Sequence, residues 1–291
     1  MHYNADMARR ARNGLLLITG VATAIFALYL VFSLVEAYDF PQFRNETMPA
    51  VAITALEQVS FVHTENRKHE YIEVTESCGP YFESACVNIR SGPGEHYPVI
   101  TTIRKGAVLK VSGKITSGER DWYKITFDEW IRYPERVRGN WYIASDFVKP
   151  FYNEGVIELS DRRNTQTEKR ILIDRSSQKL YAYDGEALFM EQSISTGIEL
   201  TPTPRGTFTI FKKTPSRYMQ GPLPGISSKY YDLPGVPWNL YFTHQGAVIH
   251  GAYWHDKFGQ PWSSGCVNVD TEKAEALYHW ADVGTKVTVR D

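Results

Sequence analysis

The hydrophobic and polar positions divide the chain into one apolar segment near the N-terminus and a long region of short alternating segments. Gly14 to Val35 is 22 residues long and contains no charged residue. A helix of that length rises roughly 33 Å, enough to cross a hydrocarbon core of about 30 Å. From Glu70 onward, short alternating stretches are separated by glycine and proline, as is typical of β-strands. The chain is therefore predicted to be mainly β, with an N-terminal transmembrane helix.

The charges around the apolar segment predict its orientation. Three arginines lie just before it, whereas two acidic residues and one arginine follow within ten residues. Because the positive side stays in the cytoplasm, we expect a cytoplasmic tail (1–13), a single-pass membrane helix (14–35) and an extracellular remainder. A cleaved signal peptide is the alternative, since 35–37 weakly resembles a cleavage site, although the segment is longer than usual. A buried soluble helix fits poorly, because the segment is apolar on every face.

Four further segments follow the apolar one. Residues 36–69 hold two prolines and mixed charge, which predicts a stalk. Residues 70–150 hold short strands split by glycine turns, which predicts a small barrel. Residues 151–168 are a predicted linker, and 169–291 a second β-rich domain. The strands expected in the barrel are 71–75, 86–90, 99–103, 107–111, 122–127 and 140–144, with a charged insert at 128–139.

In the second domain the pattern predicts a succession of strands and one short helix. The helix spans Glu272 to Ala281, with Asp270 and Thr271 as its N-cap region and Gly284 at its end. A long segment rich in proline, glycine and tyrosine, 214–237, is predicted to be a loop that covers a site. An unattached surface loop is the alternative. The strands expected are 170–174, 179–183, 187–195, 206–211, 239–243, 247–250 and 286–290, of which 239–243 and 247–250 are expected to pair.

Charge and cysteine content narrow the classes of function. A net charge of −1 gives no reason to expect nucleic acid, and no nucleotide-binding glycine motif occurs. Cys78 and Cys86 are eight residues apart around a Gly-Pro turn, so an oxidising exterior favours a disulfide between them. Three reduced cysteines remain the alternative. A disulfide there would leave Cys266 as the odd thiol.

The strongest candidate chemistry lies at Cys266 and His250. Cys266 directly follows Gly265, and a glycine lets the backbone turn sharply there. His250 ends a predicted strand 16 residues upstream, before Gly251. A thiol becomes a strong nucleophile as a thiolate, and a nearby imidazole can take its proton. Backbone N–H groups at the turn could also face an oxyanion.

Two alternatives to a nucleophile and its base remain at this point. An isolated cysteine is most often a small buried hydrophobe, and an isolated histidine an ordinary hydrogen-bonded residue. A metal site built from His244, His250, His255 and Cys266 is the other option. The spacings match no common zinc pattern, so we predict neither a metal nor a cofactor.

The segments His250-Gly251 and Ser263-Ser264-Gly265-Cys266-Val267-Asn268 resemble the signature of the L,D-transpeptidase (YkuD-type) catalytic domain. Segments 201–206 and 235–238 also recur in that family, and the resemblance extends over 169–290. It implies a β-rich catalytic domain in which Cys266 is the acylated nucleophile and His250 the base. It further implies that the Gly251 carbonyl orients the imidazole, and that Gly265 and Cys266 supply backbone donors near the oxyanion.

The resemblance also suggests which side chains contact substrate. The family usually has histidine where this chain has Ser264, and His255 is a candidate to fill that space. The residues expected to bind substrate are Asn268, Ser263, Ser264, Tyr253, Trp254, His255, Arg217, Tyr218 and Met219.

By resemblance, the reaction is acyl transfer on peptidoglycan stem peptides. The Cys266 thiolate attacks the L,D-peptide bond after the diamino acid at position three of a tetrapeptide stem, and D-alanine leaves. An amine of a neighbouring stem resolves the thioester and forms a 3–3 cross-link. Carbapenem-type β-lactams are expected to acylate Cys266. The alternatives are an L,D-carboxypeptidase, in which water resolves the thioester, and a wall-binding protein with an inactive site.

The small barrel carries a resemblance of its own. Segments 87–93, 104–106, 122–125 and 141–143 resemble a bacterial SH3-type domain. Such domains bind cell-wall peptide or act as spacers, and the composition does not show which. Together with the apolar segment 14–35, the resemblances predict a membrane-anchored exported enzyme with an SH3-like barrel followed by the catalytic domain.

Overall fold

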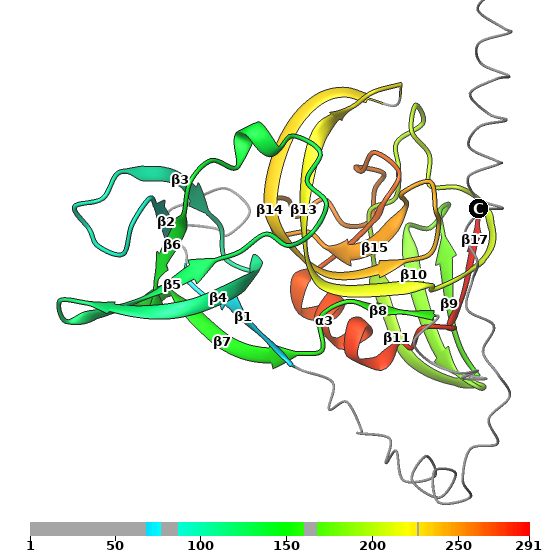
Figure 1. The fold of residues 1–291 in the computed structure, drawn as a ribbon. Coiled ribbons are helices and arrows are strands. Elements are labelled where there is room, and N and C mark those ends of the chain that lie inside the picture. The colour runs from blue at the N-terminus through cyan, green and yellow to red at the C-terminus, as the bar shows by residue number, and fades with distance from the viewer. Residues whose placement is uncertain (1–67, 77–86, 160–167, 226) are drawn as a thin grey trace, which may run out of the picture. The chain divides into compact units, whose positions relative to one another are not determined.

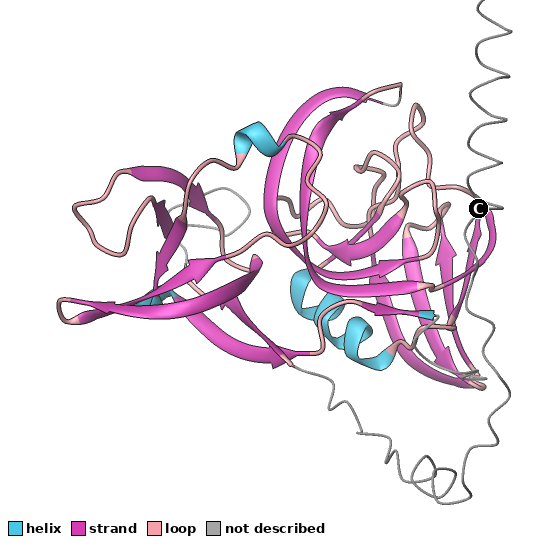
Figure 2. Ribbon diagram, in the orientation of Figure 1, coloured by secondary structure: helices cyan, strands magenta, loops and turns pink. Residues whose placement is uncertain are grey.

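The structure is a computed structural model that describes residues 68–76, 87–159, 168–225 and 227–291 (Figure 1). The described part is mainly β (Figure 2), as the alternating pattern predicts. The predicted membrane helix, most of the predicted stalk, and Cys78 and Cys86 lie outside the described residues. Within the described ranges, no helix is both long and apolar enough to cross a membrane.

The first domain is a seven-stranded antiparallel sheet in the order β3-β2-β6-β5-β4-β1-β7. The strands expected in this domain are present, some with shifted ends, and alternating apolar residues such as Val87 and Ile89 are buried on one face. Two short 3-10 helices, η1 (Pro134–Arg136) and η2 (Ser145–Phe147), lie between strands. The strands are β1 (His69–Val74), β2 (Val87–Arg90), β3 (Val99–Ile103), β4 (Val108–Ser117), β5 (Arg120–Ile125), β6 (Trp141–Ala144) and β7 (Val148–Asn153).

The segment predicted to be a linker, 151–168, contains residues of two strands, one paired with each domain. Strand β7 extends to Asn153 and pairs with β1, and β8 (Ile157–Glu158) pairs with a strand of the second domain. Pro150 lies within β7, which is an edge strand, where a residue without an N–H is tolerated. Proline therefore gave a misleading signal of a domain boundary.

The second domain contains two five-stranded sheets, with the orders β11-β10-β9-β17-β12 and β16-β15-β14-β13-β8. The predicted strands on either side of the site pair as expected, with Leu240 opposite Ile249. Alternating residues such as Ile171, Ile173 and Leu180 are buried in the core of this domain. The strands are β9 (Lys169–Asp174), β10 (Lys179–Asp184), β11 (Ala187–Ser193), β12 (Gly206–Thr209), β13 (Lys212–Leu223), β14 (Ser227–Tyr241), β15 (Val248–Gly251), β16 (Val267–Val269) and β17 (Lys286–Arg290).

The predicted helix is confirmed as α3 (Thr271–Trp280). Its N-cap is Asp270, whose carboxylate accepts hydrogen bonds from the backbone N–H groups of Glu272 and Lys273. The expected end at Gly284 is wrong. The chain is extended at Ala281, and the Gly284 N–H donates to Ile210 O instead of capping the helix.

The segment predicted to be a loop, 214–237, is instead most of a long antiparallel hairpin formed by β13 and β14. Register shifts lie between Arg217 and Met219 and between Gly221 and Leu223. Such irregularities insert residues that the ladder does not pair, so the hairpin tolerates prolines and glycines that interrupt simple alternation. The sequence pattern alone therefore suggested a loop.

The hairpin and the seven-stranded sheet share one hydrophobic cluster. Tyr218 and Val236 of the hairpin pack with Ile72 and Leu109 of the sheet. Gly235 has a φ of +70°, and a Cβ atom there would lie 2.6 Å from Val108 O. The two domains thus meet through close backbone contact rather than through a flexible connection.

Candidate active site

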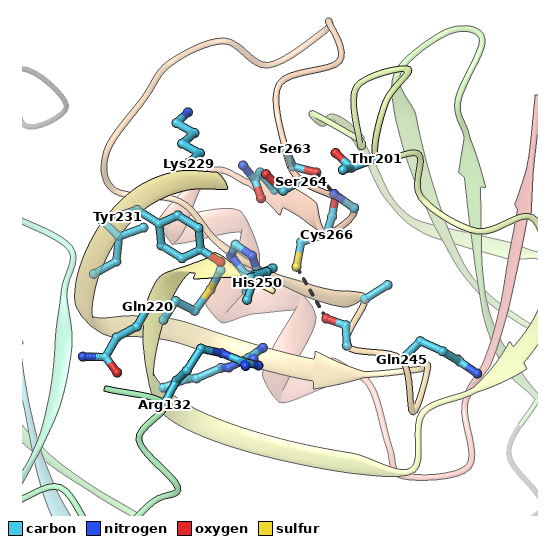
Figure 3. Close-up of a pocket in the computed structure, with 18 of the residues that line it drawn as sticks. Arg132, Thr201, Gln220, Lys229, Tyr231, Gln245, His250, Ser263, Ser264 and Cys266 are labelled. Carbon is cyan, nitrogen blue, oxygen red and sulfur yellow. Dashed lines mark hydrogen bonds between the residues drawn. The ribbon is translucent and has the colours of Figure 1, made fainter. Parts of the chain in front are cut away.

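A cavity of about 710 Å³ contains Cys266 and His250 (Figure 3). It lies beside the hairpin of β13 and β14, which forms part of its wall. Besides these two residues, its lining includes Arg104, Trp130, Arg132, Leu200, Thr201, Pro202, Pro204, Arg217, Tyr218, Met219, Gln220, Leu223, Gly225, Lys229, Tyr231, Leu233, Thr243, Gln245, Gly246, Ala247, Trp254, Trp262, Ser263, Ser264, Gly265 and Asn268.

Two adjacent parallel strands bring the catalytic candidates together. In β15 and β16, His250 lies opposite Asn268, and Cys266 directly precedes β16. The apolar neighbours Ile249 and Val267 are fully buried and fix both strands in the core. The 16-residue spacing between the two candidates thus returns the chain to the same place in the sheet.

The cysteine loop is held by hydrogen bonds of its own. Ser263 Oγ donates to Cys266 O at 2.5 Å, and the Gly265 N–H donates to Ser263 Oγ at 3.1 Å. Gly265 has a φ of +114°, a conformation that favours glycine. Thr203, in the stiff proline loop, adds a longer bond to Cys266 O at 3.4 Å. Because its N–H is already bonded, Gly265 is not a free oxyanion donor in this arrangement.

His250 has the hydrogen-bonding pattern of a base. Its Nδ1 lies 3.0 Å from the carbonyl oxygen of Gly251, which can only accept a hydrogen bond, so the ring proton is on Nδ1. Its Nε2 is buried and has no hydrogen-bond partner in the described part of the chain. Burial lowers the pKa of His250 to about 3, although the Gly251 bond acts in the opposite direction. The neutral ring therefore presents a lone pair at Nε2.

Cys266 is a neutral thiol at neutral pH. Its Sγ donates to Gly246 O at 3.7 Å, the contact drawn as a dashed line in Figure 3. Burial raises the pKa of the thiol, while the positive charge of Arg217 and the Val248 N–H oppose that rise. The resting pair is therefore an uncharged thiol and an uncharged imidazole, not an ion pair.

Most of the side chains expected to bind substrate do line the cavity. Arg217, Tyr218 and Met219 contribute from the hairpin, and Ser263, Ser264 and Asn268 from the cysteine loop and β16. Trp254 lines it as well, with its ring centroid 5.7 Å from that of His250. These seven side chains thus lie in the cavity, and their role in binding substrate stays a prediction.

Tyr253 and His255 lie elsewhere. Tyr253 is buried in the shared hydrophobic cluster, and its hydroxyl donates to Pro234 O at 2.6 Å. His255 is buried outside the cavity lining, where Nδ1 accepts from the Lys257 N–H at 3.1 Å and Nε2 lies 2.7 Å from Asn268 Nδ2. His255 thus supports Asn268 from behind and does not occupy the space beside Ser264. Its short distance in sequence from the site was misleading, because its side chain is bonded to Asn268 and is not part of the cavity lining.

Several lining residues were not anticipated from the sequence. Arg104, Trp130 and Arg132 come from the first domain, and Tyr231 and Trp262 from the second. Trp130 offers the one available signal, because a tryptophan within a charged insert, here 73% exposed, is a candidate binding residue. The other residues can be recognised as part of the lining only once the two domains are packed together.

The histidines do not gather around a metal. Among the described residues, no group of three or more His, Cys, Asp or Glu side chains could hold an ion. His244 stacks on Phe211 at 4.3 Å between ring centroids, whereas His250 and His255 have the separate partners given above.

Comparison with known proteins supports both resemblances. Residues 168–289 match the model of the L,D-transpeptidase catalytic domain, and residues 86–133 match the model of the bacterial SH3 domain. No curated protein matches the chain.

Three solved structures illustrate the similarity. A mutant of the Enterococcus faecium L,D-transpeptidase is 24% identical, covering 42% of this chain and 50% of that protein, with a TM-score of 0.39. An L,D-transpeptidase from Mycobacterium smegmatis is 21% identical, covering 76% and 99%, with a TM-score of 0.41. L,D-transpeptidase 3 from Mycobacterium tuberculosis is 17% identical, covering 62% and 98%, with a TM-score of 0.41.

The chain thus spans about half the length of the Enterococcus protein. Within it, residues 168–289 match the model of the L,D-transpeptidase catalytic domain, and residues 86–133 match the model of the bacterial SH3 domain.

Proposed function

We propose that this protein is a peptidoglycan L,D-transpeptidase that forms 3–3 cross-links through a thioester on Cys266. The observation that carries the proposal is the state of His250. Its Nδ1 proton is held by Gly251, and its buried Nε2 has no partner within the described residues and lies in the same cavity as the Cys266 thiol. A base in that state can accept the thiol proton.

In the first step, the proton of Cys266 Sγ moves to His250 Nε2. The sulfur forms a bond to the carbonyl carbon of the L,D-peptide bond, and the carbonyl oxygen becomes an oxyanion. Of the two donors expected there, the Gly265 N–H is already bonded to Ser263. The Cys266 N–H is therefore the donor that we assign to the oxyanion, a contribution of about 3–4 kcal/mol for a typical donor.

In the second step, the C–N bond breaks. The amine of D-alanine leaves with the proton that His250 received, and a thioester to Cys266 remains. The amine of a neighbouring stem then attacks the thioester carbonyl, and His250 takes the proton from that amine. Loss of the thiolate, which recovers the proton, releases the cross-linked product and restores the neutral pair.

The neutral resting pair determines when the nucleophile forms. Both groups lie in a site whose burial disfavours charge. A thiolate and an imidazolium would therefore form together with attack on a bound donor, rather than persist in the free enzyme. Because the thiolate is the nucleophile, the neutral thiol of the free enzyme reacts slowly with unrelated electrophiles.

Ser264 does not remove any part of this mechanism. Ser264 belongs to the cysteine loop and lines the cavity, whereas the base is on β15. We propose that its hydroxyl contacts substrate in place of the family's usual histidine.

We further propose that residues 14–35 anchor the protein in the cell membrane, with the catalytic domain outside the cell. This follows from the uncharged apolar segment and the arginines that precede it. A cell-wall substrate is consistent with that location.

Intact-mass spectrometry after carbapenem treatment tests the nucleophile. The expected result is a single adduct, mapped to the peptide that contains Cys266 and absent from Cys266→Ala. Incubation with tetrapeptide muropeptides tests the reaction and should give cross-linked dimers. Tripeptide monomers without dimers would indicate the L,D-carboxypeptidase instead, and neither products nor adduct would indicate a wall-binding protein.

A further inference from the structure

The charges that line the cavity are all positive. Arg104, Arg132, Arg217 and Lys229 line it, and among the described residues no aspartate or glutamate does. Clefts lined by one sign of charge concentrate ligands of the opposite sign. The cavity is therefore suited to an anionic ligand.

Two of these arginines present unsatisfied donors. Arg104 Nε and Arg217 Nη1 are buried and have no hydrogen-bond partner among the residues that the structure describes. Buried donors in folded proteins are nearly always paired, so these two call for an acceptor other than the residues that the structure describes. Arg217 lines the same cavity as Cys266 and His250, and its positive charge acts to lower the pKa of both.

Arg104 and Arg132 belong to the SH3-like domain. Arg104 follows β3, and Arg132 lies in the charged insert with its guanidinium 5.0 Å from the centre of the Trp130 ring. Figure 3 shows Arg132 and Gln220 on one side of the pocket and Ser263 and Ser264 on the other. One wall of the site is thus built by a domain that lies outside the catalytic family's match.

The charged insert, 128–139, is hydrogen-bonded to the hairpin of β13 and β14, so the wall that carries Arg132 has a defined position. The Tyr133 N–H donates to Gln220 Oε1 at 2.7 Å, and the Tyr133 hydroxyl donates to Pro222 O at 2.7 Å. Arg136 Nη1 donates to Gly221 O at 2.8 Å. These bonds hold the insert against β13 next to the arginines.

We propose that the SH3-like domain completes the donor site, and that Arg217, supported by Arg104 and Arg132, recognises the terminal carboxylate of the stem peptide. The inference rests on the proposed function and names its recognition element. The scissile bond joins the terminal D-alanine to the rest of the stem, so its carboxylate must lie close to Cys266. A guanidinium matches a carboxylate in charge and planar geometry and can form two parallel hydrogen bonds with it.

The test compares a tetrapeptide donor with the same peptide carrying a C-terminal carboxamide. The wild-type enzyme should prefer the acid by roughly tenfold or more in kcat/KM, because the carboxamide lacks the charge and leaves donors unpaired. Arg217→Gln should bring the acid-to-amide ratio close to one. The double variant R104Q/R132Q should lower the ratio by about threefold or more, mainly through KM.

Arg138→Gln is the matched control, since Arg138 is an exposed residue of the same insert whose Nε donates to Glu135 O outside the cavity. It should leave the ratio unchanged. A purely structural role of Arg217 would reduce turnover of both donors equally, so the ratio separates recognition from folding.

A wild-type ratio near one, or an unchanged ratio in Arg217→Gln, overturns the inference and leaves the transpeptidase proposal intact. An effect of Arg217→Gln without any effect of the double variant overturns the contribution of the SH3-like domain. No turnover of either donor, together with no carbapenem adduct on Cys266, contradicts the proposed function and this inference with it.

Discussion

The backbone N–H of Tyr218, in the active-site hairpin, donates a hydrogen bond of 2.8 Å to the carboxylate of Glu129, in the insert of the SH3-like domain. Burial raises the pKa of Glu129 to about 7, while the Tyr218 bond and the charge of Arg217 act in the opposite direction. One titratable group therefore joins the two domains at the edge of the cavity.

This contact predicts a pH-dependent stability. Because the pKa of Glu129 is higher in the folded protein than its ordinary value of 4.5, the folded state binds the proton more tightly. The contribution of protonated Glu129 to the free energy of unfolding is fully present below the pKa of the unfolded state. It is lost as pH rises through about 7. Glu129→Gln should therefore gain stability relative to the wild type between pH 5 and pH 8.5, by on the order of 1 kcal/mol.

Urea unfolding at the two pH values measures the difference. Glu135→Gln, an exposed residue of the same insert, serves as the matched control. A stability difference between Glu129→Gln and wild type that is the same at both pH values would contradict the assignment.

The two buried histidines near the site should respond differently to removal. His250→Ala should lower the rate of Cys266 acylation by roughly 10²–10⁴-fold, because it removes the proton acceptor. His255→Ala removes the partners of Asn268 and of the Lys257 N–H but no group of the cavity lining, and should lower the rate by about tenfold or less. Stopped-flow acylation by a carbapenem gives both rates, and thermal unfolding checks that each variant is folded. Equal losses would argue against His250 as the base.

The thiol should show little thiolate character at neutral pH. Because the pKa of Cys266 is raised by burial, its thiolate fraction at pH 7 should be smaller than that of an ordinary cysteine. Alkylation of Cys266 by iodoacetamide should accordingly be slow at pH 7 and accelerate in the alkaline range. The ultraviolet absorbance of the thiolate, compared with Cys266→Ala, follows the same titration. A thiolate signal already complete at pH 6 would show that the resting pair is ionic.

The close approach of the two domains at Gly235 should be sensitive to a single methyl group. Gly235→Ala adds a Cβ atom 2.6 Å from Val108 O at a φ of +70°. Gly118→Ala imposes a similar conformation, with a φ of +64°, but its Cβ atom meets open space. The Gly118 variant should lose about 1 kcal/mol of stability from the strained backbone.

The Gly235 variant should lose clearly more, on the order of 2–3 kcal/mol, because the backbones must separate. Denaturant unfolding compares the two variants directly. Similar losses would mean that the two backbones can separate at Gly235 at little cost in stability.

The sequence by itself determined the elements whose signals are local. The alternation of Ile171 and Ile173 predicted a half-buried strand, and Asp270 at the start of an apolar pattern predicted the helix. The residues around His250 and Cys266 indicated the chemistry, since each of the two stands directly beside a glycine. Such a short motif can be recognised in the sequence without knowledge of the fold. The predicted anchor at 14–35 is likewise a local pattern and stays a prediction.

Only the tertiary structure decided how distant segments meet. The hairpin of β13 and β14 was not predictable because its strands stabilise each other through pairing and through contacts with a domain about 100 residues upstream. The same reason hid Arg104, whose neighbours in sequence give no sign of an active site. His255 shows the converse, since it is close in sequence to His250 yet lies outside the cavity lining. Local pattern specifies which face of a strand is buried, whereas the partner that covers that face is set by packing over the whole chain.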